Sequence, residues 1–107
     1  MKINILGTDY DIRHVSEKDY PKLKTCEANG LAELYSKELI INSDMDDGSG
    51  RSYAKFEEYE KKVLRHEIIH AFFHEAGLTD YCEDEILVDW LAFQIPKMVK
   101  VFQDAKC

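Results

Sequence analysis

The chain has 107 residues, of which 45% are hydrophobic and 11% are aromatic. That length supports one hydrophobic core but not two, so we expect a single domain over residues 1–107. A formal net charge of −7 argues against a nucleic-acid-binding protein, because phosphate affinity depends on clustered lysine and arginine. No apolar run in the sequence is long enough to span a membrane, so we expect no membrane contact.

Cysteine usage indicates the cellular compartment. The three cysteines, Cys26, Cys82 and Cys107, are odd in number, and none lies in a C-x-x-C pair. The apolar run at the N-terminus is also too short and too interrupted for a signal peptide. Both features favour a reducing environment, so we expect a cytoplasmic protein.

The N-terminal part of the chain has the pattern of short strands. Apolar and polar residues alternate over residues 2–6 and 10–15, around a turn signal at residues 7–9. Two further β-like runs follow at residues 31–35 and 38–42. We therefore expect a small antiparallel or mixed sheet.

Two connections in this region are polar. Ser16 and Asp19 resemble a helix-capping pair, so either one or two helical turns or a loop should precede Pro21. Residues 42–50 form an acidic, turn-rich stretch whose spacing does not fit a calcium-binding loop. We expect it to be a solvated connection.

A single long helix is predicted over residues 52–76, with Gly77 as its stop signal. Its second half contains a His-Glu-x-x-His motif, formed by His66, Glu67 and His70, in an almost wholly apolar run. Residues four apart lie on one face of a helix, so both imidazoles can bind one metal ion. Buried histidines and carboxylates need partners, which a metal provides. Zinc suits these donors, and Glu67 is then the general base that takes a proton from zinc-bound water.

A second helix should follow, opened by a capping signal of Asp80 with Glu83. Pro96 removes one helical hydrogen bond, so we expect a kink or break there, with residues 97–103 continuing as a short helix. Three apolar side chains of that last segment are expected in the core: Met98, Val99 and Phe102.

A catalytic zinc site normally has a third protein ligand. His74 fails on distance, because on a continuous helix it lies about 12 Å along the axis from His66. Glu85 is the better candidate, since it shares a helix face with Asp89. One carboxylate can then bind the ion while the other accepts a ring N–H from a liganding histidine. Three nearby residues remain as alternative ligands: Glu83, Asp84 and Cys82.

These residues resemble the gluzincin clan of zinc metallopeptidases, whose motif is HExxH with a downstream ExxxD, here Glu85 to Asp89. Within that clan the chain is similar to small single-domain forms: minigluzincins, ImmA/IrrE-like proteins and phage- or prophage-encoded metallopeptidases. The similarity covers residues 30–96 and includes a short hairpin that ends in Ile40-Ile41-Asn42. Metzincins are a poor match, because their third histidine has no counterpart here.

The resemblance implies an α+β, minimal zincin-like domain. A small N-terminal sheet would pack on the HExxH helix, and an edge strand would bind an extended peptide. His66, His70 and Glu85 would be zinc ligands, Glu67 the general base, and Asp89 the partner of a liganding histidine. Larger gluzincins have a C-terminal subdomain that offers a histidine or tyrosine to the oxyanion. Five residues could take that part here: Tyr81, His74, Tyr59, Tyr35 and His14.

The sequence therefore predicts a zinc-dependent metallopeptidase acting on a protein or peptide substrate. For ImmA-like relatives the implied substrate is a repressor of a phage or mobile element. The alternative hypothesis is a catalytically weak, zincin-fold protein-binding module, because the C-terminal subdomain is missing. A third hypothesis is a latent enzyme whose own segment after Pro96 covers the cleft.

Overall fold

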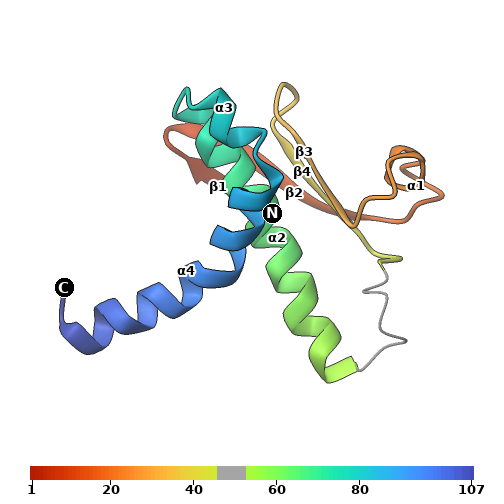
Figure 1. Cartoon of the computed structure of the whole chain (residues 1–107). Helices are drawn as coiled ribbons and strands as arrows, with labels where there is room; N and C mark the ends of the chain where they lie inside the picture. Colours follow the sequence, from red (N-terminus) through yellow and green to blue (C-terminus); the bar gives the residue numbers. More distant parts are fainter. Residues whose placement is uncertain (46–52) are drawn as a thin grey trace.

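A computed structural model describes residues 1–45 and 53–107, without the side chains of residues 53–55. Figure 1 shows the arrangement of the elements, which are, in chain order, β1 (Lys2–Ile5), β2 (Thr8–Val15), α1 (Lys22–Thr25), β3 (Gly30–Glu33), β4 (Glu38–Asn42), α2 (Tyr53–Glu75), α3 (Thr79–Cys82) and α4 (Glu85–Ala105). The chain is an α+β domain, as the sequence predicted. Most of the predicted acidic connection, from residue 46 onward, lies outside the described residues.

Four strands form one mixed sheet in the order β1-β2-β4-β3. The pairs β1–β2 and β3–β4 are antiparallel, whereas β2 and β4 run parallel. A parallel pair needs a crossover, which the segment with α1 and β3 supplies. As a result β3 lies at one edge of the sheet, with a strand partner on one side only among the described residues.

The hairpin between β1 and β2 turns at Leu6 and Gly7, earlier than the sequence predicted. Both residues have a positive φ, 51° and 95° respectively, and Ile5 pairs directly with Thr8. A two-residue turn of this kind matches the twist of the flanking strands. The second strand therefore begins at Thr8, and the prediction of a strand start at residue 10 was wrong.

The loop alternative is correct for the segment before Pro21. The Asp19 N–H donates a hydrogen bond to Ser16 Oγ at 3.1 Å, but these residues form only a turn. The short helix α1 begins after Pro21, whose fixed φ suits the entry to a helix.

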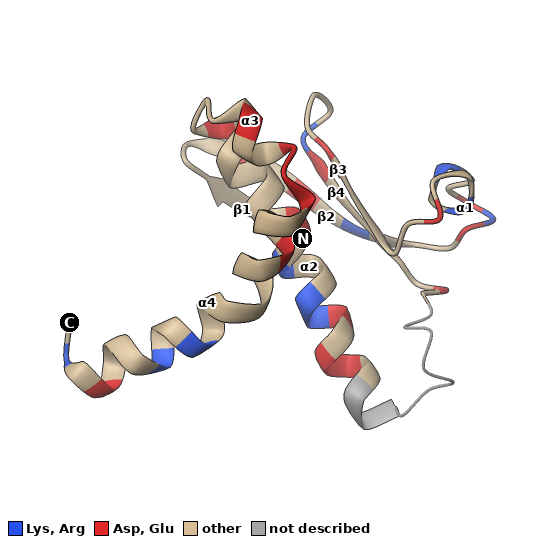
Figure 2. Cartoon of the chain, viewed as in Figure 1, with Lys and Arg blue, Asp and Glu red and all other residues tan. Residues whose placement is uncertain are grey.

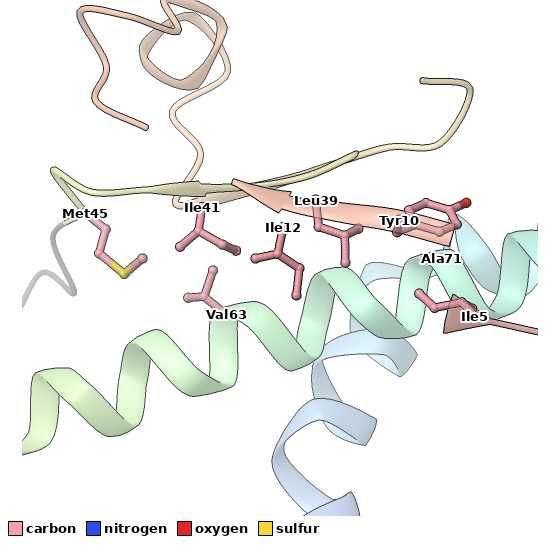
Figure 3. Close-up of a cluster of buried hydrophobic side chains, with 8 residues drawn as sticks. All are labelled: Ile5, Tyr10, Ile12, Leu39, Ile41, Met45, Val63 and Ala71. Carbon is pink, nitrogen blue, oxygen red and sulfur yellow. The ribbon is translucent and has the colours of Figure 1, made fainter. Parts of the chain in front are cut away.

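The core lies between the sheet and α2, as Figure 3 shows. Its buried side chains are Ile5, Tyr10, Ile12, Leu39, Ile41, Met45, Val63 and Ala71. The long helix predicted over residues 52–76 is confirmed as α2. It stops at Gly77, which has a φ of 76° and donates its N–H to the His74 carbonyl. Glycine suits this position, because left-handed backbone is strained for residues with a Cβ.

The second helix begins later than predicted. Asp80 belongs to the separate short helix α3, and α4 starts at Glu85. Asp84 caps α4, because its carboxylate accepts the Leu87 N–H at 3.0 Å. The spacing of Asp80 and Glu83 resembles a cap, but Asp84 has the extended backbone that a capping residue needs.

The sequence predicted a kink or a break at Pro96 and core packing beyond it. The break is wrong, because α4 runs through Pro96, whereas the ribbon does change direction along its length (Figure 1). The expected core packing of Met98, Val99 and Phe102 is wrong, because these side chains are 40%, 44% and 46% exposed. This part of α4 extends past the sheet and α2, beyond the reach of any other described element (Figure 1). Despite its length and apolar content, neither α4 nor any other described helix is suited to crossing a membrane.

Glu75, the last residue of α2, ties that helix to the sheet. Its carboxylate accepts hydrogen bonds from Tyr10 Oη at 2.8 Å and from Lys37 Nζ at 3.0 Å. Hydrogen bonds from Thr8, Lys37 and Tyr10 lower the pKa of Glu75 from 4.5 to about 2. The ionised form is therefore the one that the fold stabilises.

We expect Glu75→Gln to reduce the pH dependence of stability in acid. The pKa of Glu75 is 4.5 in the unfolded chain and about 2 in the folded one. Its contribution to the free energy of unfolding is therefore complete above pH 4.5 and is lost as the pH falls toward 2. In urea unfolding, Glu75→Gln should have a lower free energy of unfolding than the parent at neutral pH, and this difference should shrink in acid. Glu57→Gln, at an exposed position of the same helix, is the control. An equal deficit at both pH values would contradict the prediction.

Candidate metal centre

Three side chains from α2 and α4 converge on one point. The Nε2 atoms of His66 and His70 are 3.1 Å apart, because one turn of helix places both rings on the same face. Glu85, in the first turn of α4, places one carboxylate oxygen 3.0 Å from His66 Nε2 and the other 2.8 Å from His70 Nε2. All three residues offer a ligand atom within 4.8 Å of the others, so this group could hold a metal ion.

The spacing of the donors fits a small tetrahedral cation. Two atoms that each lie about 2.0–2.1 Å from one tetrahedral zinc are roughly 3.3 Å from each other. The two imidazole nitrogens are 3.1 Å apart, and they lie 3.0 and 2.8 Å from different oxygens of Glu85. These pairs need a slight expansion to match, and Glu85 would present one of its two oxygens to the ion. Two imidazoles and one carboxylate are also a donor set that zinc accepts in proteins.

The remaining ring nitrogens of both histidines are held by acceptors. His70 Nδ1 lies 2.6 Å from the Cys82 carbonyl, which can only accept, so His70 carries its proton on Nδ1. His66 Nδ1 lies 3.1 Å from an Asp89 carboxylate oxygen. Burial lowers the pKa of His70, which favours the neutral ring. The lone pairs on Nε2 therefore face one another and Glu85, an arrangement that a cation stabilises.

Asp89 is itself held by a second residue, Lys62, which sequence reasoning missed. The Lys62 ammonium forms an ion pair with Asp89. The hydrogen bond from Lys62 has the largest effect and lowers the pKa of Asp89. Burial raises this pKa and the charge of Lys62 lowers it again, so the pKa of Asp89 lies below its usual value. Lys62 lies four positions before His66, so its placement on the same helix face was a usable signal.

Glu67 is buried beside this group without a counter-charge. Its side chain is 5% exposed, and Oε2 has no hydrogen-bond partner among the described residues. Burial, and then the charge of Glu85, raise the pKa of Glu67 to about 8. A divalent cation at His66 and His70 would oppose this shift, because it favours the carboxylate form.

Gly30 in β3 lies directly against Glu67. A Cβ at Gly30 would come 2.9 Å from Val63 Cγ1 and 3.0 Å from Glu67 Cγ. Both distances are too short for carbon atoms, so a side chain at this position would displace the strand or Glu67. The absence of a side chain at Gly30 therefore lets the edge strand approach the motif helix closely.

These residues open onto one cleft of about 660 Å³ between β3 and the helices. It contains His66, Glu67, His70, Glu85 and Asp89 on the helical side. The opposite wall comes from residues 26–32 and Leu34. No described residue after Asp89 lines the cleft, so the segment after Pro96 does not cover it, contrary to the third hypothesis.

The alternative ligands lie outside the group of three. Cys82 is buried, and its thiol donates to the His70 carbonyl at 3.2 Å. Asp84 caps α4, whereas Glu83 lines the cleft without entering the group. His74 lies 4.0 Å from Glu75 Oε2, away from the centre, as the distance argument predicted.

One of the five residues considered for the oxyanion lines the cleft. That residue is Tyr59, and its hydroxyl accepts a hydrogen bond from Asn29 Nδ2 at 2.8 Å. The others lie elsewhere: Tyr35 against His74, Tyr81 against Phe73, and His14 near Glu60.

Fold and site together define a small α+β domain with a candidate three-donor metal centre in the lining of a cleft. No protein-family model matches the chain, and no curated protein or solved structure matches it. The interpretation of the site therefore depends on its geometry and chemistry.

Proposed function

We propose that this protein is a zinc-dependent metallopeptidase of the gluzincin type. The observation that supports this most is the joint placement of three donors and an unpaired carboxylate. His66, His70 and Glu85 converge, and buried Glu67 opens onto the same cleft. A structural metal site needs no free carboxylate beside it, whereas hydrolysis needs a general base.

Each residue then has a defined part in peptide hydrolysis. His66, His70 and Glu85 hold the zinc, and zinc when bound supplies a Lewis acid that polarises a carbonyl and acidifies water. Glu67 takes a proton from the attacking water and passes it to the leaving amine. Asp89 fixes the His66 ring through Nδ1, and Lys62 keeps Asp89 ionised.

The edge strand β3 is the proposed binding site for the substrate. It forms one wall of the cleft and has a free edge among the described strands. An extended segment could add to that edge as a further strand, with its backbone across the centre. We propose a protein substrate in the cytoplasm, and the resemblance suggests a phage or mobile-element repressor.

Zinc dependence of cleavage tests the proposal. Chelator-treated protein should leave a varied peptide library intact, and zinc supplied at one equivalent per chain should restore cleavage. Magnesium should not restore it, because it prefers oxygen ligands in octahedral geometry. If zinc-loaded protein cleaves nothing across such a library, the peptidase proposal fails.

A protein-binding module is the second candidate. It is favoured by the raised pKa of Glu67, about 8, because a carboxyl group that is protonated at neutral pH cannot act as a general base. Such a module would bind the same peptides with or without zinc and would release them uncut. The experiment above therefore separates the two candidates.

A further inference from the structure

The last three turns of α4 form an arm, defined here as residues 95–105. Every residue from 95 to 107 is exposed, and Figure 1 shows this part of α4 extending alone from the body of the domain. The arm is nevertheless apolar. Ile95, Met98 and Phe102 are 37%, 40% and 46% exposed.

These apolar residues continue a stripe that is packed elsewhere in the same helix. Val88, Leu91, Ile95, Met98 and Phe102 follow one another at alternating spacings of three and four, which is the spacing of a helix seam. Val88 is fully buried and Leu91 half-buried, where α4 packs on α2. The stripe continues past the end of this packing. Ile95, Met98 and Phe102 therefore have the spacing of buried residues, but no described part of the chain packs over them.

We propose that a second copy of this chain covers the arm, with two α4 arms packed antiparallel about a two-fold axis near Met98. The five apolar residues of the arm expose on the order of 400 Å², including Val99 and Val101. A standard interface has about 800 Å² per partner, slightly over half of it apolar, so burial of this whole surface would supply most of the apolar area that a stable dimer needs. An isologous pair uses the same surface on both copies, as this one would.

Charge favours the antiparallel arrangement. The chain carries a net charge of −7, whereas the arm is nearly neutral, with Lys97, Lys100 and an Asp104 that pairs with Lys100; Figure 2 shows both blue and red segments on this part of α4. Antiparallel packing places the two acidic bodies at opposite ends of the helix pair. A parallel pair would instead bring the acidic bodies together.

Sedimentation equilibrium at micromolar concentrations tests the proposal. The parent should reach twice the 12.5 kDa mass of the chain. The double variant Met98→Gln, Phe102→Gln should weaken dimerisation by at least about 30-fold, because it removes apolar anchors at the centre of the interface. The matched control is Lys97→Gln, Lys100→Gln, at helix positions outside the stripe, which should still dimerise. Circular dichroism should show equal helix content in all three proteins. A monomeric parent, or a dimer insensitive to the apolar substitutions, would overturn the proposal.

Cys107 reports the orientation of the arms. In an antiparallel pair centred near Met98 the two Cys107 residues lie about 25 Å apart, too far for a disulfide. Mild oxidation of a Cys26→Ser variant should therefore produce no dimer cross-linked through Cys107. Efficient cross-linking at Cys107 would overturn the antiparallel arrangement.

Discussion

Glu67→Gln is expected to lower kcat/KM for peptide hydrolysis by about 10²–10⁴-fold, the range typical of a lost general base. Glutamine has nearly the shape of glutamate but cannot accept the proton of the attacking water. The substitution should leave the fold intact, since it replaces a buried, unpaired carboxylate by a neutral group. Zinc should remain bound, because Glu67 does not belong to the group of three donors.

Two measurements make this prediction decisive. Elemental analysis should give equal zinc content for the parent and Glu67→Gln, so that loss of metal does not explain loss of activity. Glu57→Gln, an equivalent change at an exposed position of α2, should keep parental kcat/KM. Full activity in Glu67→Gln would remove Glu67 from the mechanism.

Glu85→Ala is expected to weaken zinc binding by at least about 100-fold, since one of three protein ligands is lost. This variant is a clean test, because the Glu85 side chain is 68% exposed and its removal leaves no cavity. Asp89→Ala should have a smaller effect, about 10–100-fold, because it acts only through the orientation of His66.

Competition with a chromogenic chelator measures these affinities. Zinc should also raise the Tm of the parent more than that of Glu85→Ala, because the stabilisation of the folded state by a ligand grows with the logarithm of ligand concentration over Kd. Glu83→Ala is the matched control, being an exposed glutamate two positions away and outside the group of three. Equal loss of zinc in Glu83→Ala and Glu85→Ala would rule out the proposed ligand set.

Helix periodicity made much of the candidate site predictable. The spacing of His66 and His70 determines that their rings share a face, and the spacing of Glu85 and Asp89 does the same on the second helix. The two pairs meet across one short connection, which is why the group of three could be anticipated. Lys62 obeys the same rule, because it lies one helical turn before His66, but a charged side chain on a helix is usually solvated and so did not stand out in the sequence.

Other features depend on tertiary structure that a local pattern does not contain. Met98 and Phe102 have the spacing of core residues, but sequence does not show where the partner surface ends. Similarly, the pairing of β2 with β4 in parallel depends on a crossover. The close approach of Gly30 to Glu67 depends in turn on that sheet order. The parallel pairing and the close approach of Gly30 could be found only from the structure.

All donors of the metal centre come from the helical half of the chain. His66 and Glu85 are only 19 positions apart, and closing a loop of that length costs little chain entropy. The parallel pairing of β2 and β4 joins residues 27 positions apart, such as Asp11 and Glu38 (38 − 11), and it also needs the crossover through α1 and β3 to be in place. Zinc could therefore clamp α2 to α4 before the sheet is complete. If the proposed zinc site is filled, the ion would help to nucleate folding, and the supply of zinc during synthesis would influence how fast the chain reaches its native state.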